Sequence, residues 1–211
     1  MRRVSIAVCG ALILIPLTPT RPAAAAPPGM PTVVEAINEL ALLTVADEEH
    51  DDTYGRNLFP HWSTVSGTCN TREEVLKRDG QNVVVNDSCT AVSGTWVSPY
   101  DGGVWTAASD IDIDHMVALK EAWRSGAHAW SPAQRRAFAN SLGDTQLWAV
   151  TDHVNQAKGD KDPSDWKPPL AGFHCDYARS WIDVKHDWQL TLQEEEKEAL
   201  EEMLATCTPA G

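Results

Sequence analysis

The sequence predicts an α+β chain, in which helices and a small antiparallel sheet flank a strand–strand–helix unit. Short alternating and β-branched segments in the middle of the chain predict strands, and apolar residues at helical spacing on either side predict helices. Strands and helices do not alternate regularly, so a parallel doubly wound sheet is not indicated. About 185 residues remain after an expected leader, which suits one domain with a hydrophobic core.

Seven segments have the features of helices. Apolar residues recur at every third or fourth position of the first, which is the spacing of one helix face. Ser131 directly before Pro132 marks a helix start, because proline suits the first helical position. Thr191 and Glu194 form a capping box for the last helix. Helices are expected at Thr32–Val45, Thr71–Arg78, Val117–Ser125, Pro132–Ser141, Asp152–Lys158, Tyr177–Trp188 and Leu192–Thr206.

Five short segments have the features of strands. The turn signal Asp101-Gly102-Gly103 separates two of them and predicts a hairpin. The segment that ends at His115 alternates aspartate with isoleucine, so a strand there places its acidic side chains on one face. Strands are expected at Val83–Val85, Ala91–Val97, Val104–Thr106, Asp110–His115 and Leu147–Thr151.

The N-terminus has the layout of a secretory signal peptide. Arg2 and Arg3 precede an apolar run from Val4 to Leu17, and the small residues Ala23–Ala26 follow. The run is too short and too interrupted by proline to span a bilayer. We divide the chain into a leader at residues 1–26, a lead-in with one helix at 27–53 and the main domain at 54–211. The expected product is a secreted, extracellular protein without a membrane anchor.

Four cysteines remain after the leader, and an even number in an exported chain indicates two disulfides. Four cysteines allow three pairings. We favour Cys69–Cys89 and Cys175–Cys207, because each of these pairs closes a local unit of the chain. A zinc site is the competing interpretation, but no two of these cysteines have the C-x-x-C spacing of a structural site.

The charge of the chain is unusual for a protein that acts on nucleic acid. The formal net charge is −13, and loss of a leader with three arginines and no acidic residue makes it −16. Phosphate backbones attract basic surfaces, so tight nonspecific binding of nucleic acid is not expected. Cleavage remains compatible with this charge if a metal cation and local lysines meet the phosphate.

Three features in the middle of the chain belong together. Asp114-His115 ends one strand, Leu147–Thr151 forms a second, and Asn155-x-x-Lys158-Gly159-Asp160 opens a helix. This order resembles the ββα-metal core of HNH (His-Me finger) nucleases. The blocks Asp112–Leu119 and Asn155–Pro163, the latter followed by Trp166–Pro169, resemble an exported HNH endonuclease family in particular. The resemblance extends over residues 54–207 and makes 54–211 the HNH domain.

The resemblance implies a role for each group in these blocks. His115 is the general base that takes a proton from water, a task suited to a group that titrates near neutral pH. Asp114 and Asn155 hold one divalent metal, and two oxygen ligands with several waters suit Mg²⁺, with Mn²⁺ as a second candidate. Without the resemblance, a histidine at a strand end is more often structural, and Asp114 and Asn155 would be capping residues.

Two details of the motif call for explanation. Adjacent residues of a strand face opposite sides, so the strand must end or bulge for Asp114 and His115 to face the same metal site. Asp112 lies on the same face as Asp114 and is an alternative ligand, or a group that supports a ligand. Gln146 stands where the family has an asparagine that braces the histidine loop. We expect Gln146 to serve as this brace, with Asp144 or Thr145 as alternatives.

Basic residues near the motif are candidates for phosphate contacts. Lys158 lies one turn after Asn155, where it is both a catalytic and a substrate-binding candidate. Arg72 and Lys161 are further substrate-binding candidates, and Lys120 and Arg56 are looser ones.

The leading hypothesis is a secreted, monomeric endonuclease that hydrolyses phosphodiester bonds of DNA, with RNA as a further candidate substrate. It uses a histidine base and one metal ion, and it leaves a 5′ phosphate. The alternative is a weak or inactive HNH-derived nucleic-acid-binding protein, for which Gln146 and the acidic charge speak. A metal-dependent hydrolase of another ester fits the ligands but has no motif of its own in the chain.

Overall fold

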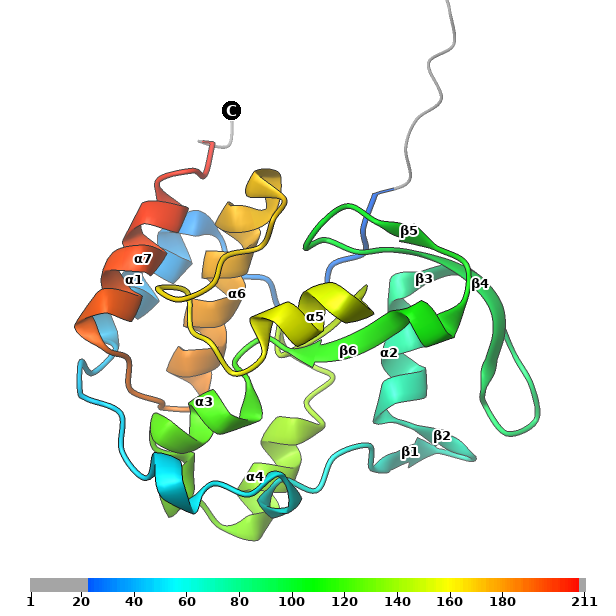
Figure 1. Cartoon of the computed structure of the whole chain (residues 1–211), viewed down its shortest axis with the longest axis horizontal. Coiled ribbons are helices and arrows are strands. Elements are labelled where there is room, and N and C mark those ends of the chain that lie inside the picture. The colour runs from blue at the N-terminus through cyan, green and yellow to red at the C-terminus, as the bar shows by residue number, and fades with distance from the viewer. Residues whose placement is uncertain (1–22, 209–211) are drawn as a thin grey trace, which may run out of the picture.

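The computed structural model describes residues 23–208, in which seven strands form three antiparallel sheets (Figure 1). The sheets consist of β1 (Thr64–Ser66) with β2 (Cys69–Asn70), of β3 (Gly80–Val85), β4 (Ala91–Val97) and β5 (Val104–Trp105), and of β6 (Ile111–His115) with β7 (Leu147–Thr151). The α-helices of this part of the chain are α1 (Val33–Leu42), α2 (Thr71–Asp79), α3 (Leu119–Arg124), α4 (Pro132–Ala139), α5 (Asp152–Lys158), α6 (His174–Asp187) and α7 (Glu194–Leu204). The predicted α+β class is confirmed. Most of the expected leader lies outside the described residues.

Helix starts follow their capping residues. Capping boxes begin four of the described helices, and the N-cap residues of the first three are Thr32, Asn70 and Ser131. The box of α7 consists of Gln193 and Glu196, so the predicted box of Thr191 and Glu194 is wrong. Thr191 donates its hydroxyl to the carbonyl oxygen of Ser125 at 3.2 Å instead.

The main differences from the sequence prediction concern a short hairpin, the start of one strand and the start of one helix. The hairpin of β1 and β2 was not expected, and its strands are only two or three residues long. Strand β3 begins at Gly80 rather than Val83, because Gly80 pairs with Trp96 of β4 although its own sequence does not favour a strand. Helix α6 begins at His174 rather than Tyr177, since a 3₁₀ turn at Ala171–Phe173 leads directly into it.

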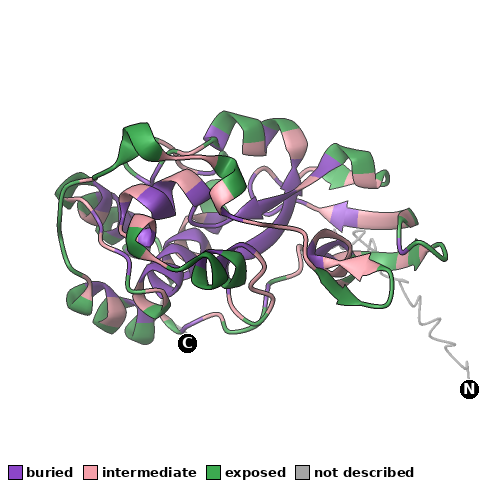
Figure 2. Ribbon diagram, turned by 90° about the horizontal axis from the view of Figure 1, so that it is seen from below, coloured by how far each residue is buried: buried purple, intermediate pink, exposed green. Residues whose placement is uncertain are grey.

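The pair of β6 and β7 lies in the middle of the fold and is buried on both faces (Figure 2). Pairing runs without interruption from Ile111 opposite Thr151 to His115 opposite Leu147. Side chains therefore alternate between two faces. Ile113 and its neighbours on one face pack with α2 in a small core. Trp148 on the other face belongs to the main core, which α1, α3, α4, α6 and α7 build. This arrangement holds the end of β6 in a fixed place.

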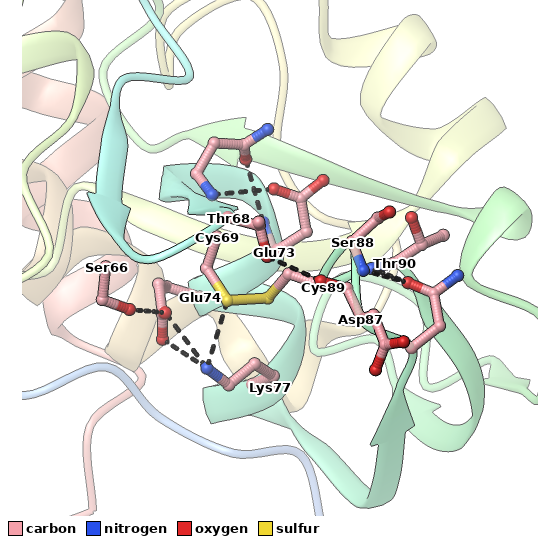
Figure 3. The surroundings of a disulfide bond; sticks show 12 residues. Ser66, Thr68, Cys69, Glu73, Glu74, Lys77, Asp87, Ser88, Cys89 and Thr90 are labelled. Carbon is pink, nitrogen blue, oxygen red and sulfur yellow. Dashed lines mark hydrogen bonds and ion pairs between the residues drawn. A yellow bond between two sulfur atoms is a disulfide. The ribbon is translucent and has the colours of Figure 1, made fainter.

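Two disulfides connect the cysteines in the predicted pairing. Cys69–Cys89 ties β2 to the loop between β3 and β4, and Lys77 and Glu74 of α2 lie beside it (Figure 3). Cys175–Cys207 ties the first turn of α6 to the segment after α7. Each bridge closes a loop of fewer than 40 residues within one part of the fold, and such loops stabilise mainly by restricting the unfolded chain. The predicted pairing is confirmed.

In residues 23–208, no helix combines the length and the apolar character that crossing a membrane requires.

Candidate active site

The strand–strand–helix unit places its polar residues around one cavity of about 430 Å³. Helix α5 follows β7 directly and lies against β6 (Figure 1). The helix ends at Lys158, and its C-cap Gly159 has a positive φ of 61°, which suits glycine. The lining residues that carry polar side chains are Tyr54, Arg56, Asp112, Asp114, His115, Lys120, Asn155, Gln156 and Asp160. The structure thus brings together three of the predicted site residues, His115, Asp114 and Asn155.

His115 is buried at the end of β6, with a fixed ring orientation. Its Nε2 lies 3.0 Å from the carbonyl oxygen of Ala139, and its ring stacks on Trp62 with centroids 5.7 Å apart. A carbonyl oxygen can only accept a hydrogen bond, so Nε2 carries the proton and Nδ1 keeps its lone pair. Burial lowers the pKa of His115 to about 3, which keeps the ring neutral at physiological pH. The ring is therefore neutral and able to accept a proton, but its lowered pKa makes it a weaker base than the near-neutral group that the sequence led us to expect.

Asp114 faces the opposite side of β6 from His115, and the strand ends directly after them, as the alternation requires. One carboxylate oxygen, Oδ2, accepts hydrogen bonds from the hydroxyl of Tyr100 at 2.5 Å and from Nζ of Lys158 at 2.6 Å. Burial raises the pKa of Asp114, and the Lys158 ammonium counteracts this rise. Oδ1 accepts no hydrogen bond from any described residue, and Asp114 lines the cavity.

Lys158 is fully buried and does not line the cavity. Its ammonium group donates to Asp114 and to the carbonyl oxygens of His115 and Met116, at 2.8 and 2.9 Å. These three acceptors use all three of its N–H groups. Burial lowers the pKa of Lys158, and Asp114 counteracts this effect. The placement does not fit the expected contact with a substrate phosphate, because the ammonium would have to leave the protein interior; Lys158 holds the end of β6 instead.

Asn155 projects from α5 toward β6. Its Nδ2 donates to Oδ2 of Asp112 at 3.1 Å. A carboxylate can only accept, so the contact fixes which end of the amide faces Asp112 and leaves Oδ1 of Asn155 free for another partner. Asp112 therefore acts in the structure as the group that orients Asn155.

Gln146 occupies the position of the expected brace, directly before β7. Its side-chain oxygen accepts from the backbone N–H of Val117 at 3.1 Å, and its side-chain nitrogen donates to the carbonyl of Val117 at 2.9 Å. Its own backbone carbonyl accepts from the N–H of Met116 at 2.7 Å. The chain that leaves His115 is thus fixed at two successive residues. Of the alternatives, Asp144 accepts from the backbone N–H of Gln146 at 3.1 Å and so supports the brace, while Thr145 donates to Asp183 at 2.7 Å.

The comparisons with known proteins agree with a nuclease-related fold. Residues 71–203 match the model of the family described as GmrSD restriction endonucleases, C-terminal domain. The chain belongs to this family. An uncharacterized secreted protein of Arthroderma benhamiae is 56% identical over 181 residues, which cover 86% of this chain and 89% of that protein. No solved structure matches the chain. With its two disulfides and this close relative, the chain is a secreted protein.

Two further residues of the cavity region precede the part that matches the GmrSD C-terminal domain family. Trp62, which covers the His115 ring, has a positive φ of 59°. Arg56 lines the cavity with an exposed guanidinium group, which forms no hydrogen bond or ion pair with any described residue. Sequence reasoning named Arg56 only as a loose candidate and missed Trp62, because no local pattern links either residue to His115. The hydrogen bond from Tyr100 to Asp114 was not expected from the sequence either.

The other basic candidates bond to the protein itself. Arg72 donates to the carbonyl oxygens of Ala108 and Ile111 at 3.1 and 3.0 Å, which fixes the start of β6. Its guanidinium is used for structure, and Arg72 does not line the cavity, so the expected substrate contact does not fit this placement. Lys161 is exposed beyond α5 and donates to the carbonyl of Ala157. Lys120 lines the cavity but is paired with acidic side chains.

Proposed function

We propose that the chain is a secreted, metal-dependent endonuclease of the HNH type that hydrolyses phosphodiester bonds of DNA, with RNA as a second candidate substrate. The observation that carries the proposal is the orientation of His115. Its Nε2–H is held by the Ala139 carbonyl, and its free Nδ1 belongs to a residue that lines the same cavity as Asp114 and Asn155. A buried histidine in one tautomer, beside two oxygen donors, is suited to general base catalysis near a metal ion.

The oxygen atoms that the cavity offers as metal ligands fit a small divalent cation. Oδ1 of Asp114 and Oδ1 of Asn155 both lack a hydrogen-bond donor among the described residues, while their other ends are held in place. One carboxylate and one amide oxygen, with the remaining positions left to water and phosphate, suit Mg²⁺ or Mn²⁺ better than zinc. When bound, such an ion polarises the scissile phosphate and stabilises the leaving 3′ oxygen.

In the proposed reaction His115 takes up the proton, and other residues of the chain hold the site in place. Nδ1 of His115 accepts a proton from the attacking water, the water oxygen bonds to phosphorus, and the bond between phosphorus and the 3′ oxygen breaks. The products are a 5′ phosphate and a 3′ hydroxyl, whose proton comes from solvent. Lys158 and Gln146 fix the backbone around His115, and Asp112 orients Asn155.

Arg56 supplies the phosphate contact that was first expected of Lys158. Its guanidinium is exposed at the cavity and has no acidic partner among the described residues, whereas Lys120 is paired with Asp51 at 2.9 Å and with Asp160 at 3.2 Å. A guanidinium with its donors free suits bidentate contact with a phosphate.

The alternative of an inactive nucleic-acid-binding protein loses part of its basis. It relied on Gln146 in place of asparagine and on the acidic charge. Since Gln146 bonds to both polar groups of the Val117 backbone, this substitution no longer speaks against activity. Only the acidic charge still favours the alternative.

The test uses mature protein and supercoiled plasmid, with Mg²⁺ or Mn²⁺ and with EDTA in excess. Metal-dependent nicking is expected, and His115→Ala should reduce the rate by about 10²- to 10⁴-fold, the usual contribution of a general base. His153→Ala is the matched control, because this exposed histidine lies on α5 and contacts Trp105 rather than the cavity. Cutting that resists EDTA would contradict the metal requirement, and full activity of His115→Ala would contradict the assignment of the base. RNA as the substrate in the same assay decides between the two nucleic acids.

A further inference from the structure

A second group of metal-binding side chains lies outside the active site, near the end of α3. Glu49, His50 and His128 each offer one ligand atom, and these atoms lie within 4.8 Å of one another. The two imidazole rings have centroids 4.0 Å apart, and Nε2 of His50 lies 4.0 Å from the Glu49 carboxylate. The ligands come from two segments that are far apart in the sequence, so their meeting is a product of the fold.

The His128 ring is oriented as in a metal site. Its Nδ1 lies 3.1 Å from the carbonyl oxygen of Trp123. Because a carbonyl can only accept, Nδ1 carries the proton and Nε2 keeps its lone pair. A histidine that binds metal commonly donates its other ring N–H to such an oxygen, which fixes both the tautomer and the ring orientation.

The segment of Glu49 and His50 is held to the same end of α3. His50 has a left-handed backbone with φ of 62°, which is uncommon for a residue other than glycine. Its carbonyl oxygen accepts from Nε1 of Trp123 at 3.0 Å and from the hydroxyl of Thr53 at 2.8 Å. The N–H of Glu49 donates to the carbonyl of Arg124 at 3.2 Å. Trp123 thus anchors both histidines, and the strained backbone turns His50 toward His128.

We propose that Glu49, His50 and His128 form a second metal site, which binds Zn²⁺. Two imidazole nitrogens and one carboxylate oxygen are a typical ligand set for Zn²⁺ and unlike the all-oxygen set that Mg²⁺ prefers. At zinc–ligand distances near 2.1 Å, tetrahedral ligand atoms lie about 3.4 Å apart. The ligand atoms lie within 4.8 Å of one another, so binding requires them to move closer, and the exposed or half-buried position of these side chains leaves them room to rotate. Water completes the coordination.

The position of the site indicates a structural role. Asp51 follows His50 directly and pairs with Lys120 at the rim of the active-site cavity, and Tyr54 and Arg56 further along line that cavity. A metal ion that joins Glu49 and His50 to His128 would hold this segment to the 3₁₀ turn Ala127–Ala129 that follows α3. Zn²⁺ should therefore raise the melting temperature through this site.

The test is calorimetric titration of Zn²⁺ into mature, EDTA-stripped protein in saturating Mg²⁺. We expect the unchanged protein to bind one equivalent of Zn²⁺. His128→Ala and His50→Asn should bind Zn²⁺ at least tenfold more weakly. Asparagine is chosen at position 50 because it tolerates the left-handed backbone. His186→Ala is the matched control, since His186 is a partly exposed histidine 3.4 Å from an acidic neighbour, Asp187. His115→Ala should bind Zn²⁺ as the unchanged protein does, which separates this site from the active site.

A second measurement guards against misfolded variants. Without zinc, His128→Ala and His50→Asn should melt close to the unchanged protein, and added Zn²⁺ should raise the melting temperature of the unchanged protein alone. Failure of the unchanged protein to bind Zn²⁺, or equal binding by His128→Ala and the unchanged protein, would overturn the proposal. Loss of zinc binding only in His115→Ala would place the ion in the active site and would overturn it as well.

Discussion

Asp112 and Asp114 lie on the same face of β6 and differ by their surroundings. Asp114 is buried and bonds to Tyr100 and Lys158, whereas Asp112 is half-buried and bonds to Asn155. In the proposed site Asp114 is the ligand and Asp112 the group that orients the other ligand. The two residues should therefore respond differently to substitution.

Asp112→Ala should weaken metal binding by about 10- to 100-fold, the usual effect of losing a group that orients a ligand. Its nicking activity should return as Mg²⁺ is raised, because Asp114 and Asn155 remain. Asp112→Asn keeps an oxygen acceptor for Asn155 and should stay close to the unchanged protein. Asp114→Ala should remain inactive at every Mg²⁺ concentration and lose about 3–5 kcal/mol of stability, because Lys158 is left unpaired in the interior.

The Mg²⁺ dependence of the nicking rate measures these effects, with urea unfolding as the stability control. If Asp112→Ala stayed inactive at all Mg²⁺ concentrations and Asp114→Ala recovered, the two roles would have to be exchanged.

Asp183 is a buried carboxyl group of α6, and its protonation links stability to pH. Burial raises its pKa from the ordinary 3.8 to about 6, although the hydroxyl of Thr145 donates to it. Between these two pKa values the folded protein holds a proton that the unfolded chain releases. The unfolding free energy contributed by this group therefore falls as pH rises through the window, and the full penalty is present above it.

Asp183→Asn should remove this penalty, since asparagine still accepts from Thr145 and has no charge. We expect the free energy of unfolding to rise by on the order of 1 kcal/mol near neutral pH and to change very little near pH 4. The gain is smaller than the full pKa shift implies, because solvent screens part of the charge. Urea unfolding at both pH values measures it. Asp87→Asn, at an exposed position, is the control for loss of charge alone. A gain of equal size at both pH values would refute the link to protonation.

At the scale of elements, the turn after β6 depends on one side chain. Gln146 bonds to both backbone polar groups of Val117, and Val117 itself is buried. Removal of this amide leaves a buried N–H and a buried carbonyl without partners, which costs about 1–3 kcal/mol for each. The turn then no longer fixes the direction in which His115 leaves the strand.

Gln146→Ala should therefore lower kcat by on the order of 10²-fold, because a shift of about 1 Å at the base has effects of this size. KM should change little, since Gln146 does not line the cavity. Gln146→Asn reaches less far and should restore only part of kcat. Gln134→Ala removes a capping glutamine of α4 and controls for a general loss of stability. Nicking rates of each variant, measured well below the melting temperature, test this prediction. An unchanged kcat of Gln146→Ala would argue against the brace.

Local patterns were sufficient to predict most elements and the framework of the site. The alternation of Asp110–His115 predicted β6, and the block that begins at Asn155 predicted a polar helix face beside it. The cysteine pairing also followed from local spacing. The strand and the helix depend on neighbours within a few residues, and each cysteine pair spans fewer than 40, so a single sequence displays these features.

Contacts between distant segments could not be predicted in this way. A lysine is usually solvated, and the burial of Lys158 arises only because β6 and the residue that follows it, 42 to 44 residues away along the chain, supply three acceptors. Arg72 likewise bonds to backbone oxygens more than 30 residues away. Trp62 stacks on His115 across 53 positions of sequence, and no periodicity connects them. The sequence thus indicated which groups are present, and the fold decides which of them face the cavity.

At the scale of the whole molecule, the acidic charge limits how nucleic acid can bind. The net charge is −13, or −16 without the expected leader, so long-range forces repel a phosphate backbone. Near the cavity, Arg56 and Lys161 are exposed cations without an acidic partner among the described residues. Substrate therefore meets only about two free cations, in addition to the proposed metal ion.

This predicts a shallow salt dependence. About two phosphate contacts give a slope near −2 for log K against log salt, so KM for duplex DNA should rise only about tenfold between 50 and 200 mM salt. A protein with six to ten contacts would lose about 10³- to 10⁵-fold over the same range. Screening of the repulsion between the acidic surface and DNA acts in the opposite direction and flattens the slope further.

Arg56→Ala should weaken binding and reduce the slope by about 1, while Lys77→Ala, beside the Cys69–Cys89 disulfide, should leave it unchanged. Initial rates at constant Mg²⁺ give these slopes, and a slope steeper than about −6 would mean that an extended basic surface, rather than Arg56 and the metal site, holds the substrate.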